Sequence, residues 1–369
     1  MKNSFFSSMA KFASLSLAVA LPTAEVIPSA LEARQSCANI ATTRSVTRGY
    51  WLVVQNTTLS ADGVACPTLN FDGTTPGPQI TADWGDNVIV HATNKLTDNG
   101  TSIHWHGIRQ LNNAQYDGVP GITQCPIAPG DTLTYKFYAG NYGSSWYHSH
   151  FILQYGDGFF GPLVINGPAT ANYDVDLGML FWNYWNHVPV QSLWDKAKTG
   201  APPTLLTGLM NGINTYNGAG KKFQTTFKSG MKYRIRVVST AVDGHFQFST
   251  DGHSFQVIAM DFVPIVQGTG VYTATTALNL VNPPRRDVMT LPNGGHLVIA
   301  FQIDNPGSWL MHCHVAWHAS EGLALQVVES EGKILPTIGT AGVSTFQDTC
   351  AAWNAWTPTE PFPQDDSGI

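Results

Sequence analysis

The sequence is poor in charge and contains no clear membrane-spanning run. Only 12% of its 369 residues are charged, against about 25% in an average protein. Acidic residues (25) outnumber basic ones (19), so the chain lacks the basic surface that nucleic-acid binding requires. The apolar run from Phe12 to Leu21 is shorter than the about 20 residues that cross a membrane as a helix. We therefore expect no nucleic-acid partner and no membrane anchor, and small neutral or cationic aromatic molecules are easier partners.

The N-terminus has the layout of a secretory signal. Lys2 and Lys11 precede the apolar run, and small residues follow it. We expect residues 1–24 to be the signal peptide, with a short propeptide to residue 34 as a further reading. Two acceptor sequons, at Asn56 and Asn99, predict glycosylated surface loops in a secreted, extracellular protein. The five cysteines suggest disulfides plus one special thiol, Cys313.

The pattern of residues predicts an all-β protein. The chain holds 35 Gly and 22 Pro, and clusters of Gly, Pro, Asn and Asp alternate with short runs rich in Val, Ile, Thr and aromatic residues. This pattern is typical of β-sandwiches or barrels. The predicted strands include Asn87–Thr93, Thr132–Tyr138, Lys232–Ser239 and His296–Gln302.

A thiolate lies between two imidazoles at His312-Cys313-His314, and His318 follows five residues after the cysteine. Neighbouring side chains of a strand point to opposite faces, so His312 and His314 share one face and Cys313 projects from the other. One strand can then serve two metal centres. A Cys thiolate with imidazoles is typical of a blue-copper electron-transfer site, and two imidazoles on the reverse face can hold a second copper centre.

Two further histidine pairs repeat this spacing: His104 with His106, and His148 with His150. Same-face positions of a strand are roughly 6 to 7 Å apart, so each pair can reach two metals of one cluster. An isolated pair is more often solvated than metal-bound, but three pairs with an interposed Cys favour copper. The remaining histidines considered stand alone, and we interpret them as structural or exposed: His91, His187, His253 and His296.

With these residues, the chain resembles the multicopper oxidases, and specifically the secreted laccases of fungi, over nearly everything after about residue 35. The resemblance is carried by the segments 103–110, 117–126, 146–150, 282–287, 304–307 and 312–323. It implies cupredoxin-like Greek-key β-barrels: one complete, one truncated and a partial third. It also implies a copper oxidoreductase that removes single electrons from phenols or aromatic amines and reduces O2 to water.

The resemblance assigns the copper ligands. It gives His104 to the type 2 copper and Cys313 with His318 to the type 1 copper. The binuclear type 3 pair receives five histidines: His106, His148, His150, His312 and His314. The axial position of the type 1 copper, ten residues after the cysteine, is Leu323, which has no donor atom and therefore favours a high potential.

Two acidic residues match positions with roles in the reaction. Asp117 resembles the acid that assists proton delivery to the copper cluster, although an Asp-Gly turn explains it equally well. Asp243 resembles the carboxylate that faces the phenol and accepts its proton as the electron leaves. The alternative for Asp243 is again a turn residue.

One motif of the family, His-Pro-x-His-Leu-His-Gly-His, is absent from the sequence. It supplies one histidine to each copper type, so three ligands are missing, with His253 as a candidate stand-in at the type 1 site. The join lies near Val266 and Gln267, where about 200 residues of a three-barrel protein are lacking. A smaller deletion is predicted before Gly49.

The resulting domain organisation is a cupredoxin domain at 47–167, a truncated one at 173–266, the C-terminal half of a third at 267–328 and a tail at 329–369. The resemblance implies a disulfide between Cys125 and Cys350, and it leaves Cys37 without its usual partner, with Cys66 as an open alternative. Half a barrel exposes strand edges and apolar residues. The sequence therefore predicts poor folding of the chain as written.

Three hypotheses follow from the sequence. The first is a monomeric laccase-like oxidase acting on phenols or aromatic amines and O2, whose missing ligands argue against activity of this form. The second is an inactive secreted copper-binding remnant. The third is an incomplete gene model, in which exons have been skipped.

Overall fold

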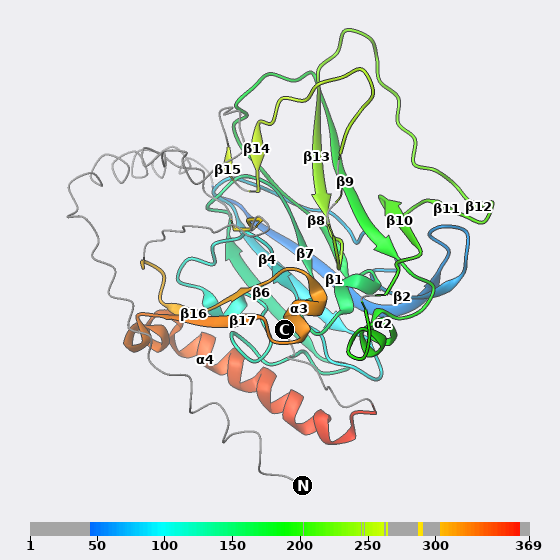
Figure 1. Cartoon of the computed structure of the whole chain (residues 1–369). Helices are drawn as coiled ribbons and strands as arrows, with labels where there is room; N and C mark the ends of the chain where they lie inside the picture. Colours follow the sequence, from blue (N-terminus) through cyan, green and yellow to red (C-terminus); the bar gives the residue numbers. More distant parts are fainter. Residues whose placement is uncertain are drawn as a thin grey trace, which may run out of the picture. The chain divides into compact units, whose positions relative to one another are not determined.

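The structure is a computed structural model that describes residues 45–201, 203–244, 246, 248–261, 263–264, 287–290 and 303–361. The predicted signal peptide and propeptide, Cys37, the strand His296–Gln302 and most of the join around Val266 lie outside these ranges. Strands carry most of the described fold (Figure 1), which confirms the all-β prediction. No helix in the described part of the chain is long and apolar enough to cross a membrane.

Two four-stranded sheets form the first domain. One sheet has the order β2-β1-β4-β6, with β1 parallel to β4 and the other pairs antiparallel. Its strands are β1 Thr47–Leu59, β2 Cys66–Phe71, β4 Asn87–Asn94 and β6 Thr132–Tyr138. The other sheet has the order β3-β8-β7-β5. Its strands are β3 Ile80–Asp83, β5 His104–Trp105, β7 Gly143–His148 and β8 Phe160–Asn166.

Alternation of side chains explains why these runs are strands with one buried face. In β4, Val88, Val90 and Ala92 are fully buried while the residues between them are partly exposed, as expected where one face of a sheet packs on the core. These side chains join Trp105 and Tyr135 in one apolar cluster. The first domain is therefore a complete sandwich, and two short 3-10 helices, η3 Ala114–Tyr116 and η4 Gln154–Asp157, interrupt its loops.

The second domain contains one three-stranded sheet in the order β10-β9-β13. These strands are β9 Val175–Trp185, β10 Thr207–Met210 and β13 Tyr233–Ser239. The described residues add only two-residue strands and one helix. These are α2 Val190–Ala197, β11 Thr215–Tyr216, β12 Ala219–Gly220, β14 Ala259–Met260 and β15 Val263–Pro264. Within the described ranges this domain is less than a full sandwich, consistent with a truncated barrel.

The C-terminal part is a hairpin followed by a long helix. Strands β16 Gly307–His312 and β17 Ala324–Glu329 pair antiparallel, and the short helix α3 Ala316–Ser320 lies in the connection between them. Helix α4 Glu331–Trp356 is interrupted at Gly339 and leads into η5 Thr357–Thr359. A disulfide joins Cys125 to Cys350, as the family resemblance implies, and ties α4 to the first domain.

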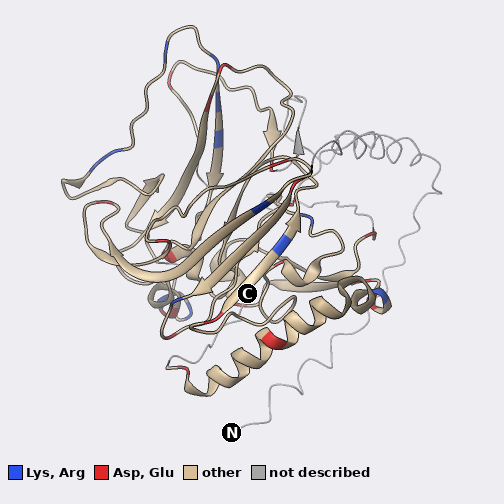
Figure 2. Cartoon of the chain, turned by 180° about the vertical axis from the view of Figure 1, so that it is seen from behind, with Lys and Arg blue, Asp and Glu red and all other residues tan. Residues whose placement is uncertain are grey.

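The predicted strands that the structure describes are confirmed with small shifts at their ends. The prediction that both sequons lie in loops is wrong for Asn56, which is exposed but lies within β1, whereas Asn99 lies in a loop and is half-buried. The thiol of Cys66 is buried and forms no disulfide within the described part of the chain. Charged side chains are thinly spread over the ribbon seen from behind (Figure 2), in keeping with the low charge content.

Candidate metal centre

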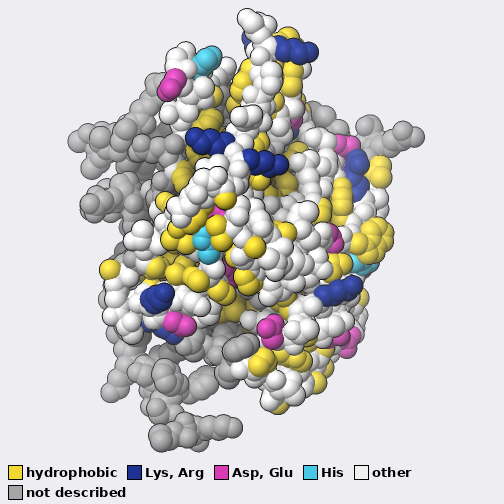
Figure 3. Space-filling view, turned by 90° about the vertical axis from the view of Figure 1, so that its right-hand side faces the viewer, with side chains coloured by type: hydrophobic (Ala, Val, Ile, Leu, Met, Phe, Trp, Pro, Cys, Tyr) yellow, Lys and Arg dark blue, Asp and Glu magenta, His cyan; other side chains and the backbone are white. Residues whose placement is uncertain are grey.

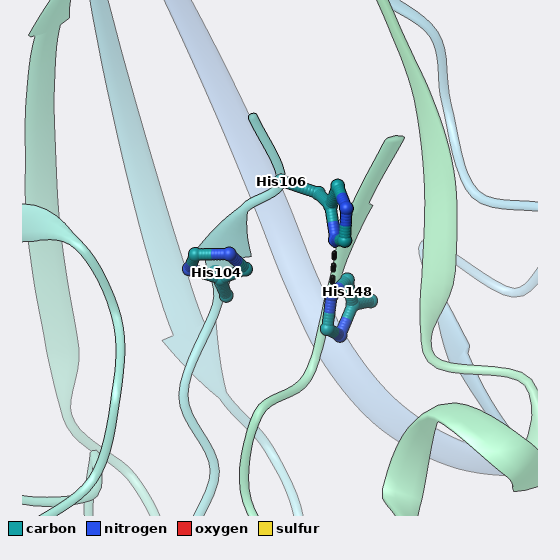
Figure 4. Close-up of side chains that lie close together, drawn as sticks. All are labelled: His104, His106 and His148. Atoms are coloured by element: carbon teal, nitrogen blue, oxygen red, sulfur yellow. Dashed lines mark hydrogen bonds between the residues drawn. The ribbon is translucent and has the colours of Figure 1, made fainter. Parts of the chain in front are cut away.

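Three histidines of the first domain converge where β5 meets β7. His104 and His148 are direct partners across these two strands, and His106 directly follows the end of β5 at Trp105. One nitrogen from each of the three rings lies within 4.8 Å of the other two. Figure 4 shows the rings of His106 and His148 facing each other, with His104 beside them. His150 follows β7 after one intervening residue, Ser149, and its ring centre is 5.3 Å from that of His104.

The C-terminal hairpin brings two more imidazoles to this group. The ring of His312, the last residue of β16, is 5.1 Å from that of His150. The ring of His314 is 5.2 Å from that of His106 and 5.8 Å from that of His148. Six of the histidines predicted as ligands therefore form one cluster built from three chain segments: His104, His106, His148, His150, His312 and His314.

Backbone carbonyls orient three of these rings. The Nδ1–H groups of His104, His148 and His312 donate to the carbonyls of Asp117, Ser149 and Cys313, at 2.7, 2.8 and 2.9 Å. Each bond fixes the tautomer and leaves the lone pair of Nε2 free, which is how metal-ligating histidines are usually held.

Burial lowers the pKa of five histidines of the cluster. Desolvation, assisted by neighbouring imidazoles, holds the pKa values of His106, His148 and His150 well below their usual range. Burial also lowers the pKa of His312, and it lowers that of His314 to about 4. A neutral imidazole is the form that binds a metal, so the rings need lose no proton at neutral pH.

The spacing of the nitrogens fits a metal. His106 Nδ1 lies 3.4 Å from His148 Nε2, and His150 Nε2 lies 3.4 Å from His312 Nε2. Two nitrogens each about 2.0 to 2.1 Å from one ion at a tetrahedral angle are about 3.4 Å apart. Nδ1 of His150 is buried and has no hydrogen-bond partner among the residues that the structure describes. An all-imidazole donor set of this kind suits copper, zinc, iron or nickel.

The second predicted centre is less complete. Cys313 Sγ lies 3.4 Å from His318 Nδ1, so the structure brings these two predicted ligands together. The backbone of Leu323 bridges them, because its carbonyl accepts the N–H of Cys313 and its N–H donates to the carbonyl of His318. The Leu323 side chain is 60% exposed and has no donor atom. Two donors are fewer than the His2Cys set of a blue-copper site, so the described residues alone do not fit that group.

His253, the candidate stand-in, is exposed, and its Nδ1–H donates to the carbonyl of Asp251 in its own turn. His91 stacks on Trp51 and bonds Thr134. His187 pairs with the buried carboxylate of Asp62 at 2.9 Å. These contacts agree with the structural reading of the lone histidines, and His296 lies outside the described residues.

Asp117 is buried beside His104. Its backbone carbonyl accepts the Nδ1–H of His104, and its Oδ1 lies 3.5 Å from the same nitrogen. Burial raises the pKa of its carboxyl group. Asp243 lies near the other centre and is half-buried. Its neighbour Val242 accepts the N–H of Ala316, two residues before His318.

Several residues at the cluster were not predicted as site residues. Trp146 stacks on His148 with ring centres 4.0 Å apart. Tyr155 lines a pocket with His148, His150 and Cys313, and its buried hydroxyl has no hydrogen-bond partner within the described ranges. Asp287 Oδ2 lies 3.4 Å from His106 Nε2. Trp146 and Asp287 lie in the segments 146–150 and 282–287 that carry the family resemblance. Only the closeness of Tyr155 to His150 in the sequence could have indicated Tyr155.

The comparisons with known proteins agree with this geometry. Sequence models of the multicopper oxidase family match residues 53–170 and 203–333. The chain is 60% identical to Laccase-1 of Botryotinia fuckeliana, with all of both chains covered, and 38% identical to Laccase-2 of the same fungus, with 97% of this chain and 99% of that protein covered. The crystal structure of the laccase from Botrytis aclada matches with a TM-score of 0.78 and 36% identity, over 89% of this chain and 96% of that one.

Proposed function

The chain belongs to the multicopper oxidase family, among the fungal laccases, and we propose that its six clustered histidines hold the copper ions at which O2 is reduced. It is a laccase-like oxidoreductase that uses copper, with phenolic compounds and O2 as its substrates. The convergence of six imidazoles from three chain segments carries the proposal. When bound, copper supplies the one-electron steps of this chemistry.

We assign the ligands by the contacts of their rings. His106, His148 and His314 lie against one another and serve one copper of the type 3 pair. His150 and His312 face each other through their Nε2 atoms and serve the second. His104 serves the type 2 copper. The chain's own contribution is to hold these nitrogens close together and oriented toward one another.

The two acidic residues act on protons. Asp117 fixes the ring of His104 through its carbonyl, and its buried carboxyl group is placed to deliver protons to the cluster. Asp243 takes the proton of a phenol as the substrate loses an electron, which leaves a neutral phenoxyl radical. The bond from Ala316 to Val242 supports this role, because it ties the loop of Asp243 to the helix that carries His318.

The chain as written retains only part of the family's ligand set. Its alignment with Laccase-1 of Botryotinia fuckeliana runs over 561 positions, whereas the chain has 369 residues, so many positions of that alignment have no residue of this chain. The absent histidine motif and the join near Val266 fit an internal loss. We propose that this form binds copper at the cluster but forms no blue type 1 centre, so its laccase turnover is low or absent.

Copper analysis of the purified chain tests the proposal. We expect bound copper by elemental analysis without intense blue colour. His148→Ala lowers the copper content, whereas the control His91→Ala, at the Trp51 stack, leaves it unchanged. A chain that takes up no copper contradicts the ligand assignment. Blue colour with full laccase turnover contradicts the loss of the type 1 centre.

The full-length transcript distinguishes the alternatives. A transcript that encodes the missing histidine motif between Val266 and Gln267 identifies an incomplete gene model and predicts a four-copper laccase. A transcript with the join leaves two candidates, a weak oxidase and an inactive copper-binding remnant, and phenol oxidation by the copper-loaded chain separates them.

We further propose that the protein is a secreted monomer with glycans at its sequons and with the domain limits 47–167, 173–266, 267–328 and 329–369. The N-terminal layout and the disulfide between Cys125 and Cys350 support export to an oxidising compartment. Analysis of culture medium by mass spectrometry tests secretion, the signal-peptide cleavage site and the glycans. Size-exclusion chromatography with light scattering tests the monomer.

A further inference from the structure

Asn305 connects the C-terminal hairpin to the first domain through its side-chain amide, while its backbone bonds within the hairpin. Its Oδ1 accepts the N–H of Asn112 at 2.8 Å, and its Nδ2 donates to the carbonyls of Arg109 and Gln110 at 3.0 and 3.4 Å. Its own N–H donates to the carboxylate of Glu329, and its carbonyl accepts the indole N–H of Trp309. The side chain is only 7% exposed, so these bonds are shielded from water.

The segment that Asn305 holds has an unfavourable backbone. Gln110 and Asn112 have φ angles of 46° and 55°, in the left-handed region that residues with a Cβ adopt at a cost. Such conformations persist only where the surroundings enforce them. The three bonds from the Asn305 amide fall on Arg109, Gln110 and Asn112.

This strained segment joins two parts of the histidine cluster. It begins three residues after His106 and leads through η3 to Asp117, whose carbonyl orients His104. Asn305 is also connected to the cluster along its own segment of the chain. Asn305 stands two residues before β16, and that strand ends at His312.

The segment that carries His312 and His314 is also anchored at its C-terminal end. Beyond His314, the side chains of Ala316 and Trp317 are buried in an apolar cluster with Phe181 and Trp194 of the second domain. His312 and His314 therefore lie on a segment fixed at both ends, with Asn305 as the anchor to the first domain.

We propose that Asn305 is a positioning residue that sets the first-domain histidines and the hairpin histidines at copper-binding distance. The proposal rests on the proposed function of the cluster. Asn305 contacts no ligand itself. It acts by holding the segment 109–112 in its strained conformation and by fixing the position of β16 relative to this segment.

A neighbouring interaction at the same junction provides a matched control. Asp304 pairs with Arg109 at 2.5 Å, but the two side chains are 32% and 38% exposed. An exposed ion pair contributes little, so Asp304→Asn should leave copper binding within about twofold of the wild type. The neighbouring substitution Asn305→Asp keeps the shape of the side chain but removes both donors and adds a charge near the Glu329 carboxylate.

The experiment measures copper affinity of the full chain by competition with a chelator, using copper(II) as the probe. We expect Asn305→Asp and Asn305→Ala to weaken binding about tenfold, at the lower end of the effect of losing a bond that orients a ligand. Adding Asn112→Gly to Asn305→Ala should recover about threefold, because glycine adopts positive φ freely. A general loss of packing would not be reversed by Asn112→Gly, because residue 112 is exposed.

Amide hydrogen exchange of residues 107–117 gives a readout independent of copper. Asn305→Asp should accelerate exchange in this segment, and Asp304→Asn should not. Wild-type affinity in both Asn305 variants, or no recovery on adding Asn112→Gly, overturns the proposal. If the wild-type chain binds no copper, the proposed function fails. Unchanged amide hydrogen exchange in Asn305→Asp is then the result that overturns the positioning role of Asn305.

Discussion

At the scale of single residues, Gly118 shows why the metal cluster depends on backbone as well as on ligands. Its φ is 87°, and an added Cβ would lie 1.9 Å from the carbonyl oxygen of Ile103. The glycine follows Asp117, whose carbonyl orients His104. The sequence allowed either a turn or a functional acid at Asp117. The structure places a buried carboxyl group in a tight turn, so the two readings are compatible.

Substitution Gly118→Ala should disrupt the His104 side of the cluster. The methyl group forces the backbone of Ile103 and Asp117 apart, and we expect a loss of about 3 kcal/mol or more in the free energy of unfolding. Copper content should fall with it. Chemical denaturation and elemental analysis provide the measurements.

Gly121→Ala is the matched control. Its φ is 73°, but nothing lies within 4 Å of its added Cβ, so only the backbone strain of about 1 kcal/mol remains. Equal losses in the two variants would contradict the steric explanation.

Most of the cluster could be predicted from the sequence because its ligands come in short motifs. The spacing of His104 and His106, and of His312 and His314, follows from strand geometry within a few residues. Asn305 and Tyr155 could not be predicted in this way. The partners of Asn305 at residues 109–112 are nearly 200 positions away, with a separation of 196 for the bond to Arg109, so no local pattern indicates the contact.

At the scale of elements, strands were predicted well and the C-terminal helix was not. Thr132–Tyr138 has the bounds expected from its alternation, with Leu133, Tyr135 and Phe137 buried. Helix α4 contains Pro336 and Gly339, which disfavour a helix, and the sequence indicated only a tail. Contacts distant in sequence support the helix instead, including the Cys350 disulfide and the packing of Trp353 on Phe151.

Helix α2 has a start that should depend on pH. Asp157 Oδ1 accepts the N–H of Val190, the first residue of α2, at 2.8 Å. Burial raises the pKa of Asp157 to about 7, although this hydrogen bond opposes the rise. An unfolded Asp has a pKa of about 3.9. As pH rises from about 4 to 7, the unfolded chain releases its proton first, so stability from this group falls over that window and levels off above it.

Asp157→Asn should remove this dependence, because the amide oxygen still accepts the Val190 N–H and carries no charge. The unfolding midpoint of the variant should fall less than that of the wild type between pH 4 and pH 7. The check is a series of denaturant titrations across this range. Parallel curves for the two proteins would show that Asp157 keeps an ordinary pKa.

At the scale of the whole molecule, the C-terminal hairpin exposes apolar side chains. Leu323, Leu325 and Val328 are 60%, 53% and 52% exposed. Apolar side chains also reach the surface in scattered groups on the face in Figure 3, with charged side chains between some of them. Apolar surface of this kind promotes association, and the poor folding expected from the sequence stays a prediction.

Replacing Leu325 and Val328 with Lys should raise the yield of soluble protein and reduce light scattering. Both side chains are already exposed, so the free energy of unfolding should change by only about 0.5 kcal/mol. The control replaces the buried Val90 by Lys, which should abolish folding. Unchanged aggregation of the double variant would locate the problem elsewhere in the chain.

The disulfide between Cys125 and Cys350 should contribute strongly to stability. Its removal by Cys350→Ser should cost about 2 to 5 kcal/mol, because the unfolded chain gains freedom. Helix α4 should then loosen from Phe151. Denaturant unfolding measures the loss. Cys66→Ala, which removes a free thiol, is the control and should have the smaller effect.

The same bond makes the polypeptide from Cys125 to Cys350 a closed covalent ring, with a sequence separation of 225 residues. The second domain and the join near Val266 both lie on the circumference of that ring. Inserting or deleting chain there changes its length but leaves its closure intact. Since closure entropy grows with the logarithm of length, doubling the ring changes this term by only about 0.6 kcal/mol. A long and a short form of the protein would therefore anchor their C-terminal helices almost equally well, whatever each can do with copper.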